Sequence, residues 1–321
     1  MNRDVAIGID IGGTNTAFGV VDRDGNCILD GTIPTAGYTE PEAYVAAVHQ
    51  QIREILLKVP DITLRGIGIG APNGNYYNGS IEFAPNLRWK GVIPIAALFQ
   101  KLVPLPVKLT NDANAAAIGE MVYGGAKGMR DFIVITLGTG LGSGIVANGE
   151  LIYGHDGFAG ELGHTIVDPN GRQCGCGRRG CLETYASAPG IKRTVFALLA
   201  DSNAESTMRS ISYNDLTAAM ISQFAAEGDP IAREAFEYTG KILGIKLADA
   251  IAHTSPEAIF LFGGLANAGE LIFEPTRRSM EQHVLKIYQN KVKLLPSGLK
   301  DKNVAVLGAS ALLWQELKKG D

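Results

Sequence analysis

The sequence has no apolar run that approaches the roughly 20 residues of a membrane-spanning helix, and no apolar signal segment precedes its first predicted strand. Its lysines and arginines also form no cluster that would suggest a nucleic-acid-binding surface. The 29 basic residues are set against 33 acidic ones, for a net charge of −4. A nucleic-acid-binding surface needs such a cluster, so we expect neither a nucleic-acid partner nor a membrane. We predict a cytoplasmic protein in a reducing compartment.

Two domains are the expected organisation for a chain of 321 residues, each large enough to bury a core. Apolar residues make up 46% of the sequence and charged residues 19%, which is ordinary for a globular enzyme. We find no low-complexity segment and no linker between independently folded modules. The 40 glycines are the unusual feature: they gather at strand ends, where a missing side chain lets the backbone approach a ligand.

A pattern of strand, glycine turn, strand, hairpin and strand occurs twice, beginning near residues 4 and 132. This repetition indicates an internal duplication, and two such halves would present two glycine turns to one cleft. The predicted strands are 4–11, 16–22, 27–33, 66–71, 107–110, 132–137, 145–147, 150–153, 258–262 and 292–295. The predicted helices are 41–59, 94–101, 113–123, 189–200, 213–227, 230–253, 269–288 and 304–318.

The glycine turns match neither common phosphate-binding motif. The sequence contains no Gly-x4-Gly-Lys-Ser/Thr, and each turn leads into a strand where a dinucleotide fingerprint requires a helix. A tight hairpin explains each turn alone equally well, but backbone N–H groups and a threonine hydroxyl can also face an anion. Duplication favours phosphate binding, for which we predict Gly12, Gly13, Thr14, Gly138, Thr139, Gly140, Gly263 and Gly264. Asp10, at the mouth of the first turn, could hold Mg²⁺.

Asp112 ends a predicted strand and begins a helix, so it could simply be the N-cap of that helix. It also lies at the carboxyl end of a strand, where open α/β sheets bind ligands, and we predict that it is a general base. Phosphoryl transfer to an alcohol needs such a carboxylate to orient the hydroxyl and accept its proton. A sugar pocket needs further polar groups for neighbouring hydroxyls, and the candidates are Asn86, Asn111, Glu161 and Glu183.

Three of the four cysteines fall within eight positions, namely Cys174, Cys176 and Cys181, and His164 stands ten residues upstream. One histidine and three cysteines complete a tetrahedral zinc site and leave no position for a catalytic water, so the site would be structural. Two alternatives remain open. Cys174 or Cys176 could pair with Cys181 in an oxidised compartment, or the thiols could be idle beside a loop histidine. The clustering favours zinc.

Taken in order, these motifs resemble the ROK family of kinases and repressors, and within it the glucokinases and related hexose kinases. The resemblance covers about residues 5–315. It is carried by Asp10-Ile-Gly-Gly-Thr14, Leu137-Gly-Thr-Gly-Leu-Gly-Ser-Gly144, Asn111-Asp112, Glu161-x-Gly-His164 and Cys174-x-Cys176-x4-Cys181-x-Glu183.

The resemblance implies an α/β protein with the actin-like ATPase (ribonuclease H-like) fold, in which two α/β lobes flank a cleft and zinc holds a loop. Residues 1–112 and the final helix, about 304–321, would form the small lobe. Residues 113–303 would form the large lobe, with the zinc loop and a homodimer surface.

The activity implied is ATP-dependent and Mg²⁺-dependent phosphorylation of the glucose 6-hydroxyl. Asp112 would be the base, while Asn86, Asn111, Asp112, Glu161, His164 and Glu183 would hold the sugar. His164 would then use one ring nitrogen for zinc and the other for the sugar.

Rival interpretations concern the substrate and the function. N-acetylglucosamine, mannose, fructose or allose could replace glucose as the acceptor. Family repressors carry a winged helix-turn-helix of roughly eighty residues before the first phosphate motif, which begins here at residue 10, so the sequence does not favour DNA binding. A sugar sensor without kinase activity is disfavoured by Asp112 together with the intact glycine turns.

Overall fold

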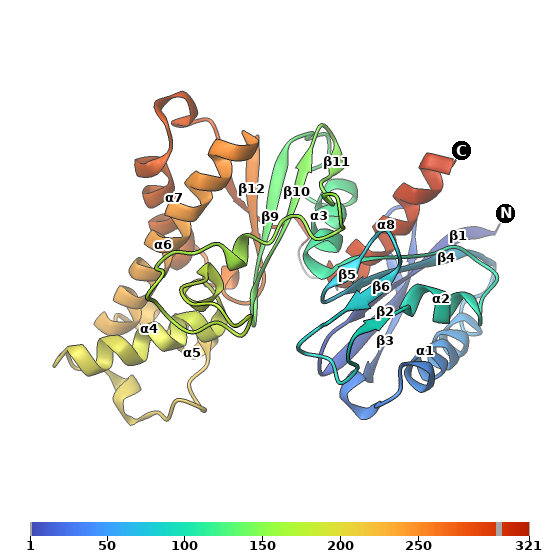
Figure 1. Ribbon diagram of the computed structural model, residues 1–321, viewed down its shortest axis with the longest axis horizontal. Coiled ribbons are helices and arrows are strands. Elements are labelled where there is room, and N and C mark those ends of the chain that lie inside the picture. The colour runs from blue at the N-terminus through green and yellow to red at the C-terminus, as the bar shows by residue number, and fades with distance from the viewer. Residues whose placement is uncertain (1, 300–303, 321) are drawn as a thin grey trace. The chain divides into compact units, whose positions relative to one another are not determined.

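The computed structural model describes residues 2–299 and 304–320, which form two compact units (Figure 1). The first unit contains the chain up to 129, residues 150–159 and the chain from 297; the second contains 130–149 and 160–296. The predicted large lobe began at residue 113, but the structure groups 113–129 with the first unit. Residues 1, 300–303 and 321, which the predicted lobes include, lie outside the described range.

The main sheet of the first unit has the strand order β3-β2-β1-β4-β8. β1 and β4 are parallel, as are β4 and β8, whereas β2 is antiparallel to both of its neighbours. The strands are β1 (Arg3–Ile11), β2 (Asn15–Asp22), β3 (Cys27–Pro34), β4 (Ile62–Ala71) and β8 (Val107–Asn111). Because β1, β4 and β8 run the same way, their carboxyl ends meet at one edge of the sheet.

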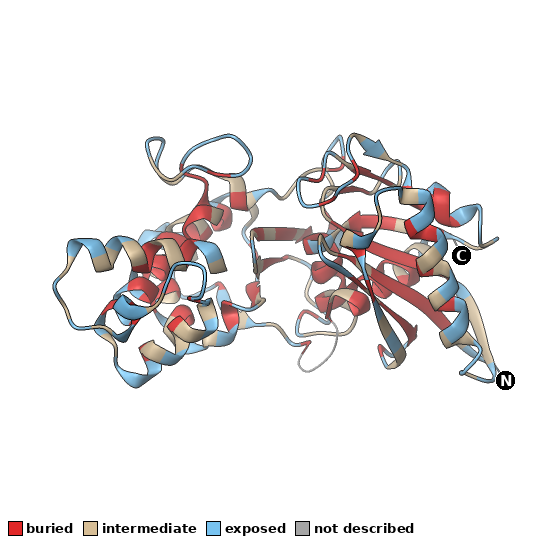
Figure 2. Ribbon diagram, turned by 90° about the horizontal axis from the view of Figure 1, so that it is seen from below, coloured by how far each residue is buried: buried red, intermediate tan, exposed pale blue. Residues whose placement is uncertain are grey.

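Alternation along β1 explains how two layers of helices cover this sheet. Val5, Ile7 and Ile9 are buried in one core with residues of the helix α1 (Pro41–Leu56). Gly8 faces α8 (Val304–Gly320), where an added Cβ would lie 2.0 Å from the carbonyl oxygen of Val306. Gly8 therefore allows a helix to pack closely on the sheet, a role that the sequence analysis did not assign to the glycines. In this sheet β1, β2, β4 and β8 are largely buried (Figure 2), whereas the edge strand β3 is mostly intermediate or exposed.

Two further helices and a small sheet complete the first unit. α3 (Asp112–Val122) packs closely on α8, since a Cβ on Gly308 would lie 2.2 Å from the carbonyl oxygen of Ala115. α2 (Ile95–Gln100) contributes to the core shared with α1. The short strands are β5 (Gly74–Asn75), β6 (Ser80–Glu82), β7 (Val92–Ile93) and β11 (Glu150–Leu151), of which the first three form a sheet of their own.

A second five-stranded sheet repeats the arrangement of the first, with β11-β10-β9-β12-β13 in the places of β3-β2-β1-β4-β8. β10 (Leu141–Ala147) is antiparallel to β9 (Phe132–Leu137), and β12 (Ala258–Phe262) is parallel both to β9 and to β13 (Lys293–Pro296). The order and direction of these strands support the predicted internal duplication.

Helices form most of the remaining core of the second unit. They are α4 (Ala188–Asp201), α5 (Ala218–Glu227), α6 (Pro230–Thr254) and α7 (Glu270–His283). α6 and α7 pack along their length, and α4 and α5 contact α6. Gly240 allows the first contact, because a Cβ there would lie 2.6 Å from the Pro275 ring. Short 3₁₀ turns connect these elements and include η2 (Leu162–His164) and η3 (Leu182–Thr184).

Most differences from the predicted elements concern their ends. The helix predicted over 213–227 begins at Ala218 because Thr217 caps it, its hydroxyl accepting a hydrogen bond from the Met220 N–H. The helix predicted over 269–288 ends at His283. The strand predicted over 145–147 begins at Leu141, so the glycine turn before it is shorter than expected. No helix among the described residues is long and apolar enough to cross a membrane.

Candidate functional site

The first glycine turn connects β1 to β2 and is fixed by backbone hydrogen bonds. The Gly12 N–H donates to the Asn15 carbonyl at 3.0 Å, while the N–H groups of Thr35 and Ala36 both donate to the Thr14 carbonyl. Gly13 lies directly against the predicted sugar ligand Asn86. A Cβ on Gly13 would be 2.6 Å from the carbonyl oxygen of Asn86, so only glycine fits there without a shift.

Asp10 and Asp112 lie on either side of Gly70. Gly70 is the β4 neighbour of Asp10, and its Cβ position is 4.0 Å from Asp10 Oδ1 and 3.7 Å from Asp112 Cα. Burial, and to a lesser extent the negative charge of Asp112, raises the pKa of Asp10 to about 7. Two carboxylates at the carboxyl ends of β1 and β8, the strands on either side of β4, make a polar edge suited to a cation.

Asn111 is the N-cap of α3, and its Oδ1 accepts a hydrogen bond from the Ala113 N–H at 2.8 Å. Asp112 occupies the first helical position and is exposed. Its Oδ1 also accepts from the Ala113 N–H at 2.8 Å, so its second carboxylate oxygen is the one that a ligand would meet. The capping role considered for Asp112 therefore belongs first to Asn111.

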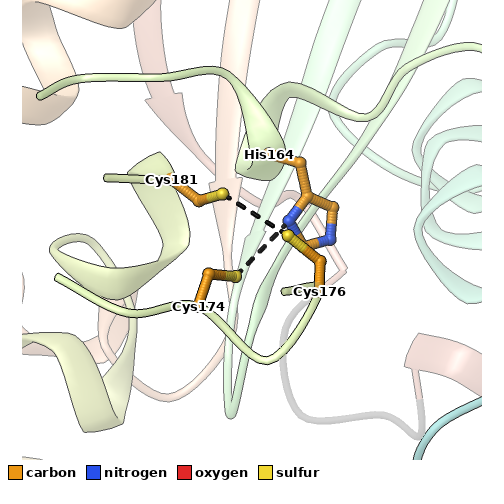
Figure 3. Close-up of side chains that lie close together, drawn as sticks. All are labelled: His164, Cys174, Cys176 and Cys181. Carbon is orange, nitrogen blue, oxygen red and sulfur yellow. Dashed lines mark hydrogen bonds between the residues drawn. The ribbon is translucent and has the colours of Figure 1, made fainter. Parts of the chain in front are cut away.

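His164, Cys174, Cys176 and Cys181 converge, with one ligand atom from each lying within 4.8 Å of all the others (Figure 3). Cys174 Sγ is 3.7 Å from His164 Nδ1, and Cys176 Sγ is 3.6 Å from Cys181 Sγ. A disulfide needs about 2 Å, and the cysteines are free. One imidazole and three thiols in this arrangement could hold a metal ion, and the donor set is that of zinc.

Arg178 favours the thiolate form of Cys176. Burial opposes ionisation of Cys176, but hydrogen bonds from Arg178, and from Cys174 and Cys181, lower the pKa of this thiol to about 6. Burial raises the pKa of Cys174 and of Cys181. Arg178 also donates to the carbonyl oxygen of His164 at 2.7 Å. Because Nδ1 of His164 faces the sulfur atoms, Nε2 points elsewhere and lies 4.0 Å from a carboxylate oxygen of Glu161.

Glu183 connects the cysteine cluster to the second glycine turn, which the sequence analysis did not anticipate. Its Oε1 is 3.3 Å from Cys174 Sγ, and its Oε2 accepts a hydrogen bond from the Leu141 N–H at 3.2 Å. A Cβ on Gly140 would lie 2.5 Å from the same Oε2. The carboxylate thus connects the candidate metal ligands to the turn that contains Gly138, Thr139 and Gly140.

The third glycine pair also lies at the second turn. A Cβ on Gly263 would be 2.6 Å from the carbonyl oxygen of Leu137, and the Leu265 N–H donates to that carbonyl at 3.1 Å. Gly264 has open space where a side chain would be. The structure therefore gathers the predicted residues in two groups. Asp10, Gly12, Gly13, Thr14, Asn86, Asn111 and Asp112 lie in the first unit, and the other predicted residues lie in the second.

Arg172 anchors the cysteine loop and was not identified from the sequence. Its guanidinium donates to the carbonyl oxygens of Thr184 and Gly190 and to Thr194 Oγ1, at 2.9, 3.0 and 2.9 Å. It also lies over the Tyr185 ring, 4.5 Å from the centroid. No periodicity or spacing in the sequence distinguishes this arginine from its neighbours, because its partners lie 12 to 22 residues away.

Comparison with known proteins identifies the family of the chain. The ROK family model matches residues 6–316. A glucokinase of Streptomyces coelicolor is 38% identical over 284 residues, 87% of each chain. A xylose repressor of Bacillus spizizenii is 31% identical over 96% of this chain and 76% of its own length. The crystal structure of a ROK family glucokinase from Streptomyces griseus, in complex with glucose and AMPPNP, has a TM-score of 0.82 at 34% identity, covering 97% of this chain and 99% of that one.

The fold expected from the motifs is confirmed by this likeness, which gives a mixed α/β protein of the actin-like ATPase type. Both the family model and the relatives above 30% identity span most of the chain. The chain belongs to the ROK family, as its motifs predicted.

Proposed function

We propose that this chain is an ATP-dependent hexose kinase that transfers the γ-phosphate of ATP to the 6-hydroxyl of glucose. The glucokinase of Streptomyces coelicolor and the glucose–AMPPNP complex of the Streptomyces griseus enzyme support this choice of substrates. The observation that carries the proposal lies in the first unit. The exposed Asp112 stands across Gly70 from Asp10, at the same sheet edge as the glycine turn.

Asp112 is the general base of the proposed reaction. Its carboxylate accepts the proton of the sugar hydroxyl while that oxygen attacks the γ-phosphorus, and ADP leaves with the electrons of the broken bond. Most of the rate enhancement comes from positioning and from neutralising phosphate charge. Asp10 would hold Mg²⁺, which supplies positive charge to the phosphate oxygens when it is bound. The N–H groups of the glycine turns at Gly12 and Gly138 are the proposed donors to phosphate oxygens.

The remaining predicted residues hold the sugar in this proposal. They are Asn86, Asn111, Glu161, His164 and Glu183, whose amide, imidazole and carboxylate groups suit neighbouring hydroxyls. His164 would bind zinc through Nδ1, which leaves Nε2 for the substrate. Zinc would be held by His164, Cys174, Cys176 and Cys181 and would serve structure, because no ligand position stays open for a water.

Initial rates with ATP against a panel of hexoses test the proposal directly. We expect turnover with glucose and its loss, by a factor of about 10³ or more, in Asp112→Asn, which keeps the shape of the side chain. Glucose binding measured by calorimetry should persist in that variant. The matched control is Asp30→Asn, which removes an exposed carboxylate from β3. Full activity in Asp112→Asn would contradict the role given to this residue.

A second candidate function is sugar-responsive regulation. The similarity to xylose repressors, over 96% of this chain in the example above, favours it. Failure of every hexose as an acceptor, together with sugar-dependent binding of operator DNA, would support a regulator. Turnover with N-acetylglucosamine, mannose, fructose or allose in preference to glucose would keep the kinase and change its substrate.

Assembly and compartment belong to the same proposal. A homodimer is expected from the family resemblance, and light scattering on the purified chain would test it. The free thiols of the cysteine cluster suit a reducing, cytoplasmic compartment.

A further inference from the structure

We propose that three buried hydroxyls, those of Thr16, Thr35 and Tyr44, position the first glycine turn and the segment 86–89 relative to each other. Thr16 and Tyr44 are then positioning residues for both substrates of the kinase. This inference rests on the proposed function, because it assigns the turn to ATP and Asn86 to the sugar. All of these residues lie in the first unit.

The three hydroxyls form a continuous chain of hydrogen bonds. Thr16 Oγ1 is 2.7 Å from Thr35 Oγ1 and 2.7 Å from the Tyr44 hydroxyl. Thr16 and Tyr44 are completely buried, and Thr35 is 3% exposed. Inside a protein such bonds are directional and costly to break, since a hydroxyl that loses its partner finds no water.

One end of this chain holds the glycine turn. Thr16 is the second residue of β2 and follows the turn directly. Thr35 contributes its backbone as well, because its N–H donates to the Thr14 carbonyl at 2.8 Å and the Ala36 N–H donates to the same oxygen at 3.2 Å. A displacement of Thr35 therefore displaces Thr14, the residue of the turn whose hydroxyl is proposed to face phosphate.

The other end of this hydrogen-bond chain, the Tyr44 side chain, contacts the segment 86–89. The Tyr44 ring packs on Trp89 with 4.7 Å between the ring centroids, and Trp89 is 5% exposed. Asn86, three residues before Trp89, lies against the turn, since a Cβ on Gly13 would be 2.6 Å from the Asn86 carbonyl oxygen. The turn and the segment thus share a direct contact and a common support, so loosening the support should weaken both substrates together.

The hydroxyls are not needed to fill the core, which makes their role separable from packing. Valine has nearly the shape of threonine without the hydroxyl, whereas serine keeps the hydroxyl and loses a methyl group. Thr16→Val should therefore preserve packing and break the hydrogen-bond chain. Thr16→Ser should weaken packing and preserve the chain.

The test compares these two variants by steady-state kinetics, AMPPNP calorimetry and thermal unfolding. In Thr16→Val we expect the KM for ATP and the KM for glucose both to rise about fivefold to tenfold, with kcat within about twofold, because one buried hydrogen-bonding group is lost. Thr16→Ser should keep both KM values within about twofold of the parent even though its unfolding temperature falls. Tyr44→Phe should resemble Thr16→Val.

Tyr38→Phe is the control, because the Tyr38 ring meets the Tyr44 ring edge-on at 5.9 Å and its hydroxyl lies outside the network. Unchanged KM values in Thr16→Val and Tyr44→Phe, or equal rises in the valine and serine variants, overturn the inference and leave the kinase in place. An unaltered chain that phosphorylates no hexose overturns the proposed function instead. The AMPPNP affinities of the same variants then still decide whether the network positions the turn.

Discussion

Replacing Asp10 by asparagine should stabilise the folded chain at neutral pH while removing the proposed Mg²⁺ ligand. The pKa of Asp10 is raised from 3.8 to about 7, mainly by burial and further by Asp112. The charged carboxylate therefore costs the folded state free energy that asparagine, with the same shape and no charge, does not. Each unit of this pKa difference corresponds to about 1.4 kcal/mol, so Asp10→Asn should gain about 4 kcal/mol in the free energy of unfolding above pH 7.

The pH dependence of this effect has a definite sign. Below about pH 4 the carboxyl is protonated in both folded and unfolded chains, and the two proteins should be equally stable. Between about pH 4 and pH 7 only the unfolded parent has released the proton, so the parent loses stability as the pH rises. Above about pH 7 both states are ionised, and the advantage of Asp10→Asn stays constant.

Urea unfolding followed by tryptophan fluorescence measures this difference in the relevant unit, because both tryptophans, Trp89 and Trp314, belong to the first unit. The buffers contain no Mg²⁺ and span about pH 5 to 8. Asp30→Asn on the exposed face of β3 is the control and should show no such trend. If Asp10→Asn is no more stable than the parent at pH 8, burial does not raise the pKa of Asp10 as described.

Three further changes test the contacts described above. Cys174→Ser should lower the zinc content of the purified protein, measured by mass spectrometry, from about one ion per chain to near zero, because a neutral hydroxyl replaces a thiolate ligand. Gly13→Ala should weaken AMPPNP at least about tenfold in calorimetry, since its Cβ would lie 2.6 Å from the Asn86 carbonyl oxygen. Glu120→Ala should lower the free energy of unfolding by about 3 kcal/mol in urea, because the buried carboxylate accepts from the Gly298 N–H at 3.1 Å and from Ser297.

The parts of the structure that the sequence predicted are those with a local signal. The strand–turn–strand repeat is visible because glycines interrupt apolar runs of strand length in the same order twice, and the strand orders of both units agree with it. The cluster of candidate metal ligands was predictable because Cys174, Cys176 and Cys181 are close in sequence and His164 is near them. In both cases the residues that form the feature lie close together in the sequence, so their spacing alone was enough to predict it.

The features that the sequence did not predict depend on distant partners or very short elements. The strands β5, β6 and β7 have only two or three residues, too few to show an alternation. Glu183 meets the Leu141 N–H across 42 positions, and Thr16 meets Tyr44 across 28. Polar residues of this kind look alike in sequence whether they bind a substrate or a neighbouring strand, so only coordinates separate the two uses.

The interleaved path of the chain limits how the protein can be divided. A fragment that stops at residue 129 would lack the helix whose Leu313 and Trp314 pack with Ala6, and would expose one face of its main sheet to water. A fragment of 130–296 would contain residues 150–159 without the rest of the unit with which they are grouped. Split-reporter designs and truncations that cut the backbone once therefore leave at least one half without a complete interior. Circular permutation is the better strategy, because it keeps every segment in the same molecule.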